Sequence, residues 1–332
     1  MRLTGRPWHA LAVLGLVMVM IYARSVSYGW AYDDSTWLPM QQAPTLFSVG
    51  YLPVWALSAA LAGPGAFHAG LIGVHLLNGI LFFVLLRRWV APWAAVLAVG
   101  LFWLHPLQVG AVAYLSGGRE ALLAAYLLAG LLALLRPSVG AFLGALACLW
   151  CAFTMKPSAA ALVVLLPLTV IVDRAIWSGW LSWGLGFVGS CGAGYWMGML
   201  GGRVDLGLPH AGEVLGAIGA LLARVVVPAG LTPLHTWTRF GAWPVDLGLV
   251  LGAVALVALA VWAAKQGQPW PALVVSVLLI GLGARILIKD APPLQEPHTY
   301  LPFLVIWAAL GAVGRRWLQG GMTDAGISEN AL

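Results

Sequence analysis

Two adjacent carboxylates, Asp33 and Asp34, are the residues of this chain best suited to chemistry. They follow the first apolar segment of a sequence in which only 8% of the residues are charged and 61% are hydrophobic. One aspartate would be enough to cap a helix, whereas two neighbouring negative charges repel unless a cation or basic groups compensate them. Such a pair can bind a divalent metal or take a proton from an acceptor hydroxyl. We therefore interpret Asp33 and Asp34 as catalytic candidates, with Asp34 also a candidate metal ligand.

A second candidate is the loop that begins at His105-Pro106 and ends at Arg119-Glu120. Pro106 ends the preceding helix, and the glycines before Arg119 permit a tight turn into the next helix. A helix N-terminus beside an arginine binds anions readily, although Glu120 in the first turn also simply suits the helix dipole. The loop is thus either a structural turn or a contact for a phosphate or metal. In the second case His105 and Glu120 join Asp34 as metal ligands.

Further polar residues lie at or within apolar segments. Lys156 either extends its amine to the membrane interface or pairs with a lipid phosphate. His75 and Asn78, three residues apart, share one helix face, and we interpret them as interhelical hydrogen-bonding groups. Arg224 lies inside an apolar stretch, where an ionisable residue is a functional candidate, and pairing with Glu213 is the structural alternative.

Composition predicts the elements that position these residues. The chain has 332 residues with 41 Gly and 18 Trp, and its mean hydropathy is +0.92. These values predict an all-α, polytopic transmembrane helix bundle with outer-face loops and short juxtamembrane helices. The net charge of +6 favours anionic lipids rather than nucleic acid as partners, because the basic residues lie mostly at helix ends. The Cys148–Cys151 pair has CxxC spacing but lies in an apolar helix, so we interpret both thiols as inert.

Apolar segments of helical length number eleven, and they lie near residues 8–24, 66–86, 90–104, 120–135, 138–155, 158–172, 177–201, 213–231, 247–264, 270–288 and 300–314. The positive-inside rule favours ten spans with 213–231 re-entrant, and eleven spans is the alternative. The first segment is expected to be an uncleaved signal anchor, followed by a first outer loop at 25–65. Residues 1–317 form the predicted transmembrane domain and 318–332 a short cytoplasmic tail. Most acids then fall on the outer face, which is where we expect the chemistry.

Four stretches occur in a recognisable order: Asp33-Asp34; His75-Leu76-Leu77-Asn78; His105-Pro106-Leu107-Gln108 through to Glu120-Ala121-Leu122-Leu123-Ala124; and Lys156-Pro157. Weaker matches are Val227-Pro228-Ala229-Gly230-Leu231 and Tyr300-Leu301-Pro302. Over residues 20–310 the set resembles the integral-membrane GT-C glycosyltransferases. The nearest resemblance is to the membrane part of the protein O-mannosyltransferase-like family whose eukaryotic members carry tetratricopeptide repeats.

The resemblance implies a hexosyltransferase with a GT-C-like fold in the bacterial inner (plasma) membrane, active toward the periplasm or outside. It would move a sugar, such as mannose, from a polyprenyl-phosphate carrier to a hydroxyl of a protein or glycolipid. Asp33 or Asp34 would act as general base or metal ligand, and Mg or Mn would be the divalent metal. The resemblance places His105, Glu120 and Lys156 where the family has its donor-phosphate and metal contacts. We expect Arg119, Arg224, His298 and Tyr300 to bind substrate as well.

Two departures from the family pattern support an alternative. The late loop has Glu296-Pro297-His298-Thr299-Tyr300 where the family usually has Glu-Arg-Tyr, and Arg119 stands one place late after Ser116-Gly117-Gly118. The chain would then be a non-catalytic GT-C-like subunit docked to a larger membrane complex. A lipid or solute transporter is a weaker alternative, because no paired broken helices occur in related halves.

Overall fold

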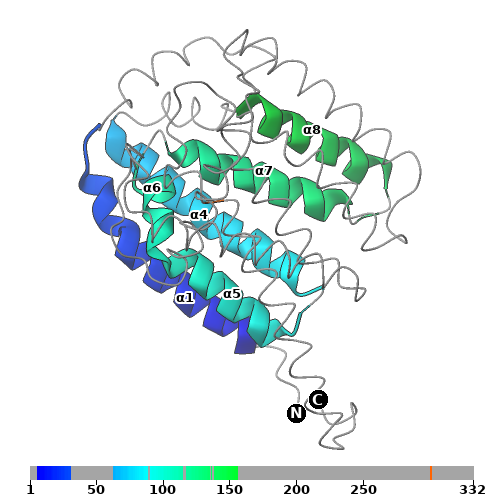
Figure 1. Cartoon of the computed structure of the whole chain (residues 1–332), viewed down its shortest axis with the longest axis horizontal. Helices are drawn as coiled ribbons and strands as arrows, with labels where there is room; N and C mark the ends of the chain where they lie inside the picture. Colours follow the sequence, from blue (N-terminus) through cyan, green and yellow to red (C-terminus); the bar gives the residue numbers. More distant parts are fainter. Residues whose placement is uncertain are drawn as a thin grey trace, which may run out of the picture.

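The computed structural model describes residues 6–30, 63–88, 90–114, 117–134, 136, 138–155 and 300. Within these residues the chain forms helices and no strand, so the all-α expectation is confirmed for this part (Figure 1). The elements are α1 (Arg6–Ala23), η1 (Arg24–Ser27), α4 (Pro64–Leu86), α5 (Pro92–Leu104), η4 (Pro106–Gln108), α6 (Val109–Val112), α7 (Gly118–Leu134) and α8 (Val139–Met155). The spans predicted beyond residue 158 and most of the 25–65 loop lie outside the described residues.

Local sequence explains where these helices begin and end. Pro64 and Pro92 occupy the first helical positions of α4 and α5, where a missing N–H costs nothing. Gly63, just before α4, has φ of 106°, a conformation that favours glycine. Pro106 follows the end of α5, and the axis bends by 55° between Pro92–Leu104 and Pro106–Val112. The five long helices agree with their predicted segments within two residues at each end.

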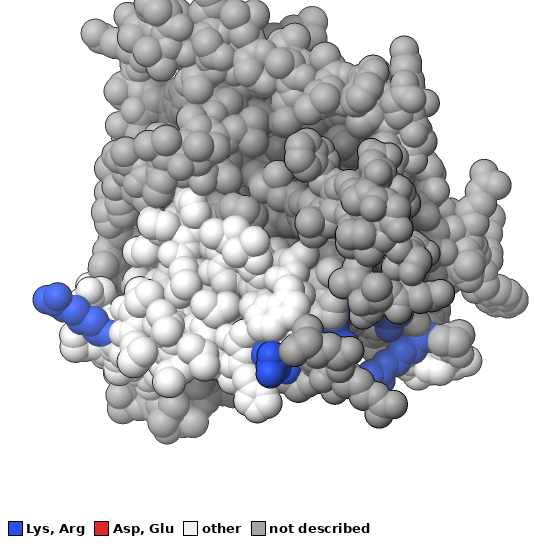
Figure 2. Space-filling model, turned by 90° about the horizontal axis from the view of Figure 1, so that it is seen from below, with Lys and Arg blue, Asp and Glu red and all other residues white. Residues whose placement is uncertain are grey.

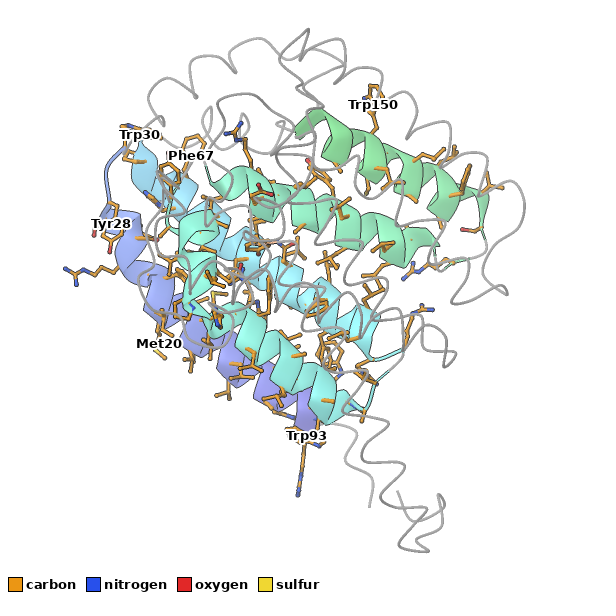
Figure 3. The ribbon with its side chains drawn as sticks, viewed as in Figure 1. Met20, Tyr28, Trp30, Phe67, Trp93 and Trp150 are labelled. Carbon is orange, nitrogen blue, oxygen red and sulfur yellow. The ribbon has the colours of Figure 1, made fainter. Side chains whose placement is uncertain are left out.

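Among the described residues, two helices, Arg6–Ser27 and Pro64–Leu86, are long and apolar enough to cross a membrane, and the bent pair that begins at Pro92 is a third candidate. Large apolar side chains remain exposed along α1 and α5, among them Val13, Leu16, Met20 and Leu97. Figure 2 shows the face seen from below, with Lys and Arg at the edges of an uncharged area. In Figure 3, Tyr28 and Trp30 lie at one end of this face and Trp93 at the other, as expected of membrane interfaces.

The helices alternate in direction. In Figure 1, α1, α5 and α8 run toward the upper left of the view, and α4 and α7 run in the opposite direction. Arginines 6, 87, 88 and 136 therefore gather at the opposite end, because they begin α1 or follow α4 and α7. Arg24 after α1 and Arg119 at the start of α7 belong to the other end, so four of the six described arginines lie where the positive-inside rule predicts the cytoplasmic side. The end that carries His105 and Glu120 is correspondingly the predicted outer end.

Trp103, at the end of α5, packs against a glycine of α4. A Cβ atom on Gly79 would lie 2.1 Å from both Cε2 and Nε1 of the Trp103 indole. A Cβ on Gly15 of α1 would lie 3.5 Å from Cη2 of the same ring. The indole is 1% exposed and fills the space between α4 and α1. Close helix approach at small residues is a common way of packing helices in membranes.

We predict that Gly79→Ala destabilises the chain by about 3 kcal/mol, because the indole must move from its site. Gly73→Ala is the matched control, since it lies on the same helix and its Cβ would meet nothing within 4 Å. That control should change stability by less than about 1 kcal/mol. Thermal unfolding of both variants in detergent measures the difference, and equal Tm values would contradict the packing described here.

Candidate functional site

The structure describes some of the predicted site residues and not others. His105, Arg119, Glu120 and Tyr300 belong to the described part. The remaining ones lie outside the described residues: Asp33, Asp34, Lys156, Arg224 and His298. The geometry below therefore concerns the loop between α5 and α7 and the surroundings of Tyr300.

His105 occupies the break between α5 and η4. Its Nδ1 accepts the backbone N–H of Leu107 at 3.2 Å, which caps the short η4 helix. The residue is 9% exposed, so the ring is held in place by the turn that Pro106 introduces. The predicted turn in this loop is thus present. With Nδ1 as acceptor, the neutral ring carries its hydrogen on Nε2, so Nε2 can donate to a phosphate but can bind a metal only if the hydrogen moves to Nδ1 and the cap is lost.

Glu120 lies in the first turn of α7 and is 3% exposed. Its backbone N–H donates to the carbonyl of Gly117 at 3.0 Å, and the positive end of the helix dipole favours its carboxylate. A Cβ on Gly118 would lie 2.4 Å from Cδ2 of Leu71. Gly118 is therefore explained by close packing of α7 on α4. Arg119, between them, is partly exposed.

The predicted metal site requires Asp34 with His105 and Glu120. The residues that the structure describes contain no group of three or more His, Cys, Asp or Glu side chains that could hold a metal ion. Since Asp34 lies outside them, the predicted set of three ligands stays a prediction.

A buried hydrogen-bond network joins α4, α5 and α7 to Tyr300. Nδ1 of His75 lies 2.6 Å from the Tyr300 hydroxyl, and Nε2 lies 3.3 Å from the Trp103 carbonyl. Nδ2 of Asn78 donates to the Ala121 carbonyl at 2.8 Å and to the Tyr300 hydroxyl at 3.0 Å. His75, Asn78 and Tyr300 are all fully buried. The interpretation of His75 and Asn78 as interhelical hydrogen-bonding groups is confirmed.

The acceptors in this network fix the direction of each bond. A carbonyl can only accept, so Nε2 of His75 donates to Trp103 and Nδ2 of Asn78 donates to Ala121. The Tyr300 hydroxyl accepts from Asn78 and therefore donates its own hydrogen to Nδ1 of His75. The Trp103 indole N–H in turn donates to the His75 carbonyl at 3.0 Å. His75 and Trp103 thus bind each other through two reciprocal hydrogen bonds.

Aromatic rings enclose the His75 imidazole. The ring centroids of Phe102 and Tyr300 lie 5.0 Å and 5.5 Å from it, and that of Tyr22 lies 5.7 Å away. Phe102 and Tyr300 also contact each other edge to face at 5.2 Å. Burial makes an internal partner valuable to each polar group here, and within the described residues Asn78 Oδ1 is the one side-chain atom of this network without a partner.

The amide of Gln108 is a feature that motif reading did not single out. Gln108 is fully buried, and within the described part of the chain neither of its amide atoms has a hydrogen-bond partner. Sequence reasoning also did not find the role of Trp103, since nothing in its neighbourhood distinguishes it from the other tryptophans. Gln108 is the last residue of the His105-Pro106-Leu107-Gln108 stretch, so this motif could have indicated it as a candidate site residue.

Comparison of the chain with models of protein families, with curated proteins and with solved structures finds no match. Any assignment of function therefore depends on the residues themselves and on how they are arranged.

We predict that Asn78→Ala lowers the free energy of unfolding by about 2 kcal/mol, because the Ala121 carbonyl loses its side-chain donor in a buried setting. Leu77→Ala is the control on the neighbouring position, where the side chain is 45% exposed. It should change stability by about 0.5 kcal/mol or less. Chemical denaturation in detergent measures both, and a loss at position 77 as large as that at position 78 would contradict the network.

Proposed function

We propose that this chain is a GT-C-type glycosyltransferase that uses a lipid-phosphate-linked sugar on the outer face of the membrane. One observation supports the proposal. Single groups from three stretches of the family pattern meet in one buried cluster: the His75 and Asn78 side chains of the first, the Ala121 carbonyl at the end of the second, and the Tyr300 hydroxyl. A fold of ten or eleven spans, mostly beyond the described residues, is part of the same proposal.

The proposed reaction transfers a hexose from a polyprenyl phosphate to an acceptor hydroxyl. Asp33 or Asp34 takes the hydroxyl proton as the acceptor oxygen attacks the anomeric carbon. The bond between that carbon and the phosphate oxygen breaks, and polyprenyl phosphate leaves with its electron pair. Cationic groups lower the barrier because they stabilise the negative charge that develops on the phosphate. Arg119, Lys156 and Arg224 are the proposed cations, with His298 in the late loop.

The donor chemistry of the proposed metal ligands fits a divalent cation. Asp34 and Glu120 would supply carboxylates. His105 would supply an imidazole through Nε2 in the tautomer that carries its hydrogen on Nδ1, which gives up the hydrogen bond from Leu107. An imidazole in the set favours Mn over Mg, which prefers oxygen ligands and water. When bound, such a cation neutralises charge on the donor phosphate. Gln108, with a donor and an acceptor in one amide, suits the hydroxyl groups of a sugar.

We predict that Asp33→Asn or Asp34→Asn lowers glycan formation by at least about a hundredfold, since each removes a carboxylate needed for proton transfer. Mass spectrometry of outer-surface proteins and lipids, with and without the chain, identifies the glycan and then measures each variant. Asp246→Asn, an outer-loop acid outside the four stretches, is the control and should leave the glycan unchanged. Full activity in both single variants and in the double variant would refute the general-base role.

We also predict that EDTA stops glycan formation by membranes containing the chain, and that Mn²⁺ restores it at lower concentration than Mg²⁺. Glu120→Gln should raise the Mn²⁺ concentration for half-maximal activity at least about tenfold, because a ligand loses its charge. Activity that persists in EDTA would show that no metal is needed.

A second candidate function, a non-catalytic subunit of a larger membrane complex, is favoured by one observation. Gly118 lets α7 pack closely on the Leu71 side chain, so the glycines of this loop do not in themselves indicate a phosphate. Stoichiometric co-purification with a membrane complex, together with unchanged glycans after deletion of the chain, would support this function instead.

A further inference from the structure

Arg87 contacts two aromatic rings at the end of α4. Its guanidinium carbon lies 5.8 Å from the centroid of the Trp8 ring and 5.7 Å from that of Phe83. The two rings meet edge to face, with their centroids 4.8 Å apart. Trp8 belongs to the first turn of α1 and Phe83 to the last turn of α4. The cluster therefore joins the ends of two helices that are each long and apolar enough to cross a membrane.

The ring contacts leave the N–H donors of Arg87 available. A guanidinium carries five donors in its plane, and its attraction to the face of a ring uses none of them. Arg87 is exposed. Glu120, the only acidic residue among the described ones, lies in the first turn of α7 at the other end of the bundle. A phosphate, whose oxygens match two parallel N–H donors of a guanidinium, is a group that this arginine can bind.

Two further arginines place positive charge near Arg87. Arg88 is the next residue, and Arg6 precedes Trp8 by two positions; both arginines are exposed. Two residues of helix advance by about 3 Å, so Arg6 lies at nearly the same level as the ring contacts. Trp8 is 42% exposed, and exposed tryptophans at the ends of membrane-spanning helices mark the level of the lipid headgroups. The anions present at that level are lipid phosphates.

We propose that this end of the chain binds the headgroup of an anionic phospholipid. Arg87 binds the phosphate, while Trp8 and Phe83 position its guanidinium. Arg6 and Arg88 supply further positive charge, which favours a lipid with a net negative charge, such as phosphatidylglycerol, over a zwitterionic one that brings its own cation. The site lies at the end of the bundle opposite the candidate functional site and does not depend on the proposed glycosyl transfer.

Native mass spectrometry of the full chain in detergent, titrated with one lipid at a time, measures the affinity for the first bound lipid. Phosphatidylglycerol should bind about tenfold more tightly than phosphatidylcholine. Arg87→Ala should weaken the binding of phosphatidylglycerol about tenfold, because it removes a charge-assisted pair of hydrogen bonds. Arg24→Ala is the matched control, since Arg24 is exposed and lies beyond the other end of α1. Removal of the same charge at that distance should change the affinity by less than about twofold.

Two further variants separate the positioning of the guanidinium from its charge. Arg87→Lys keeps the charge without the planar pair of donors, so it should still weaken binding about threefold. Trp8→Leu removes a ring that holds the guanidinium and should weaken binding about fourfold. Trp93→Leu is its control, because Trp93 is 47% exposed at the start of α5, at the same end of the bundle (Figure 3). That variant should leave the affinity unchanged.

Equal affinities for the two lipids would overturn the proposal, as would equal effects of Arg87→Ala and Arg24→Ala. Equal effects of Trp8→Leu and Trp93→Leu would overturn the positioning role of Trp8. Displacement of phosphatidylglycerol by inorganic phosphate at the same concentration would indicate a site for free phosphate and overturn the lipid assignment. None of these measurements requires glycan formation, so a failure here is distinguishable from a failure of the proposed function.

Discussion

The contact between the Trp103 indole and Gly79 is the constraint on which the rest of the described structure depends. The ring occupies the space that a side chain at position 79 would need, and its N–H binds the His75 carbonyl one turn earlier on α4. This contact fixes the position of the end of α5 along α4 and α1, and it fixes the rotation of α5 about its own axis. The position of the His75 ring follows, because the Trp103 carbonyl accepts its Nε2 hydrogen. The hydrogen bond between His75 and the Tyr300 hydroxyl follows from this arrangement.

The helices of this part were predictable because their signals are local. Apolar runs, prolines at helix starts and glycines before them lie next to the boundaries they determine. The interhelical role of His75 and Asn78 could also be inferred, since two polar groups on one face of an apolar helix must find partners. Their actual partners could not be inferred. A contact with Tyr300, 225 residues away, leaves no trace in any local pattern.

The candidate site was predictable only as a set of residue types. The sequence pattern correctly indicated a turn at His105-Pro106, but it could not decide that the ring caps η4. It also assigned the glycines before Arg119 to a tight turn, whereas Gly118 begins α7 and allows close approach to Leu71. The same few residues thus serve helix capping and packing and are also the candidates for binding a phosphate or metal. Glu120 illustrates this, because packing buries its carboxylate at the helix N-terminus where a charged ligand would also be favoured.

The link between Tyr300 and His75 also sets an order for how the chain is made. At synthesis rates of 5–20 residues per second, roughly 11–45 s pass between the appearance of position 75 and that of position 300, given their separation of 225 residues. During that interval the imidazole and the Asn78 amide are already in the membrane without their final tyrosine partner. The early helices must therefore be shielded from lipid at this face, by one another or by the insertion machinery. Assembly of the nascent protein is completed only when its last part arrives.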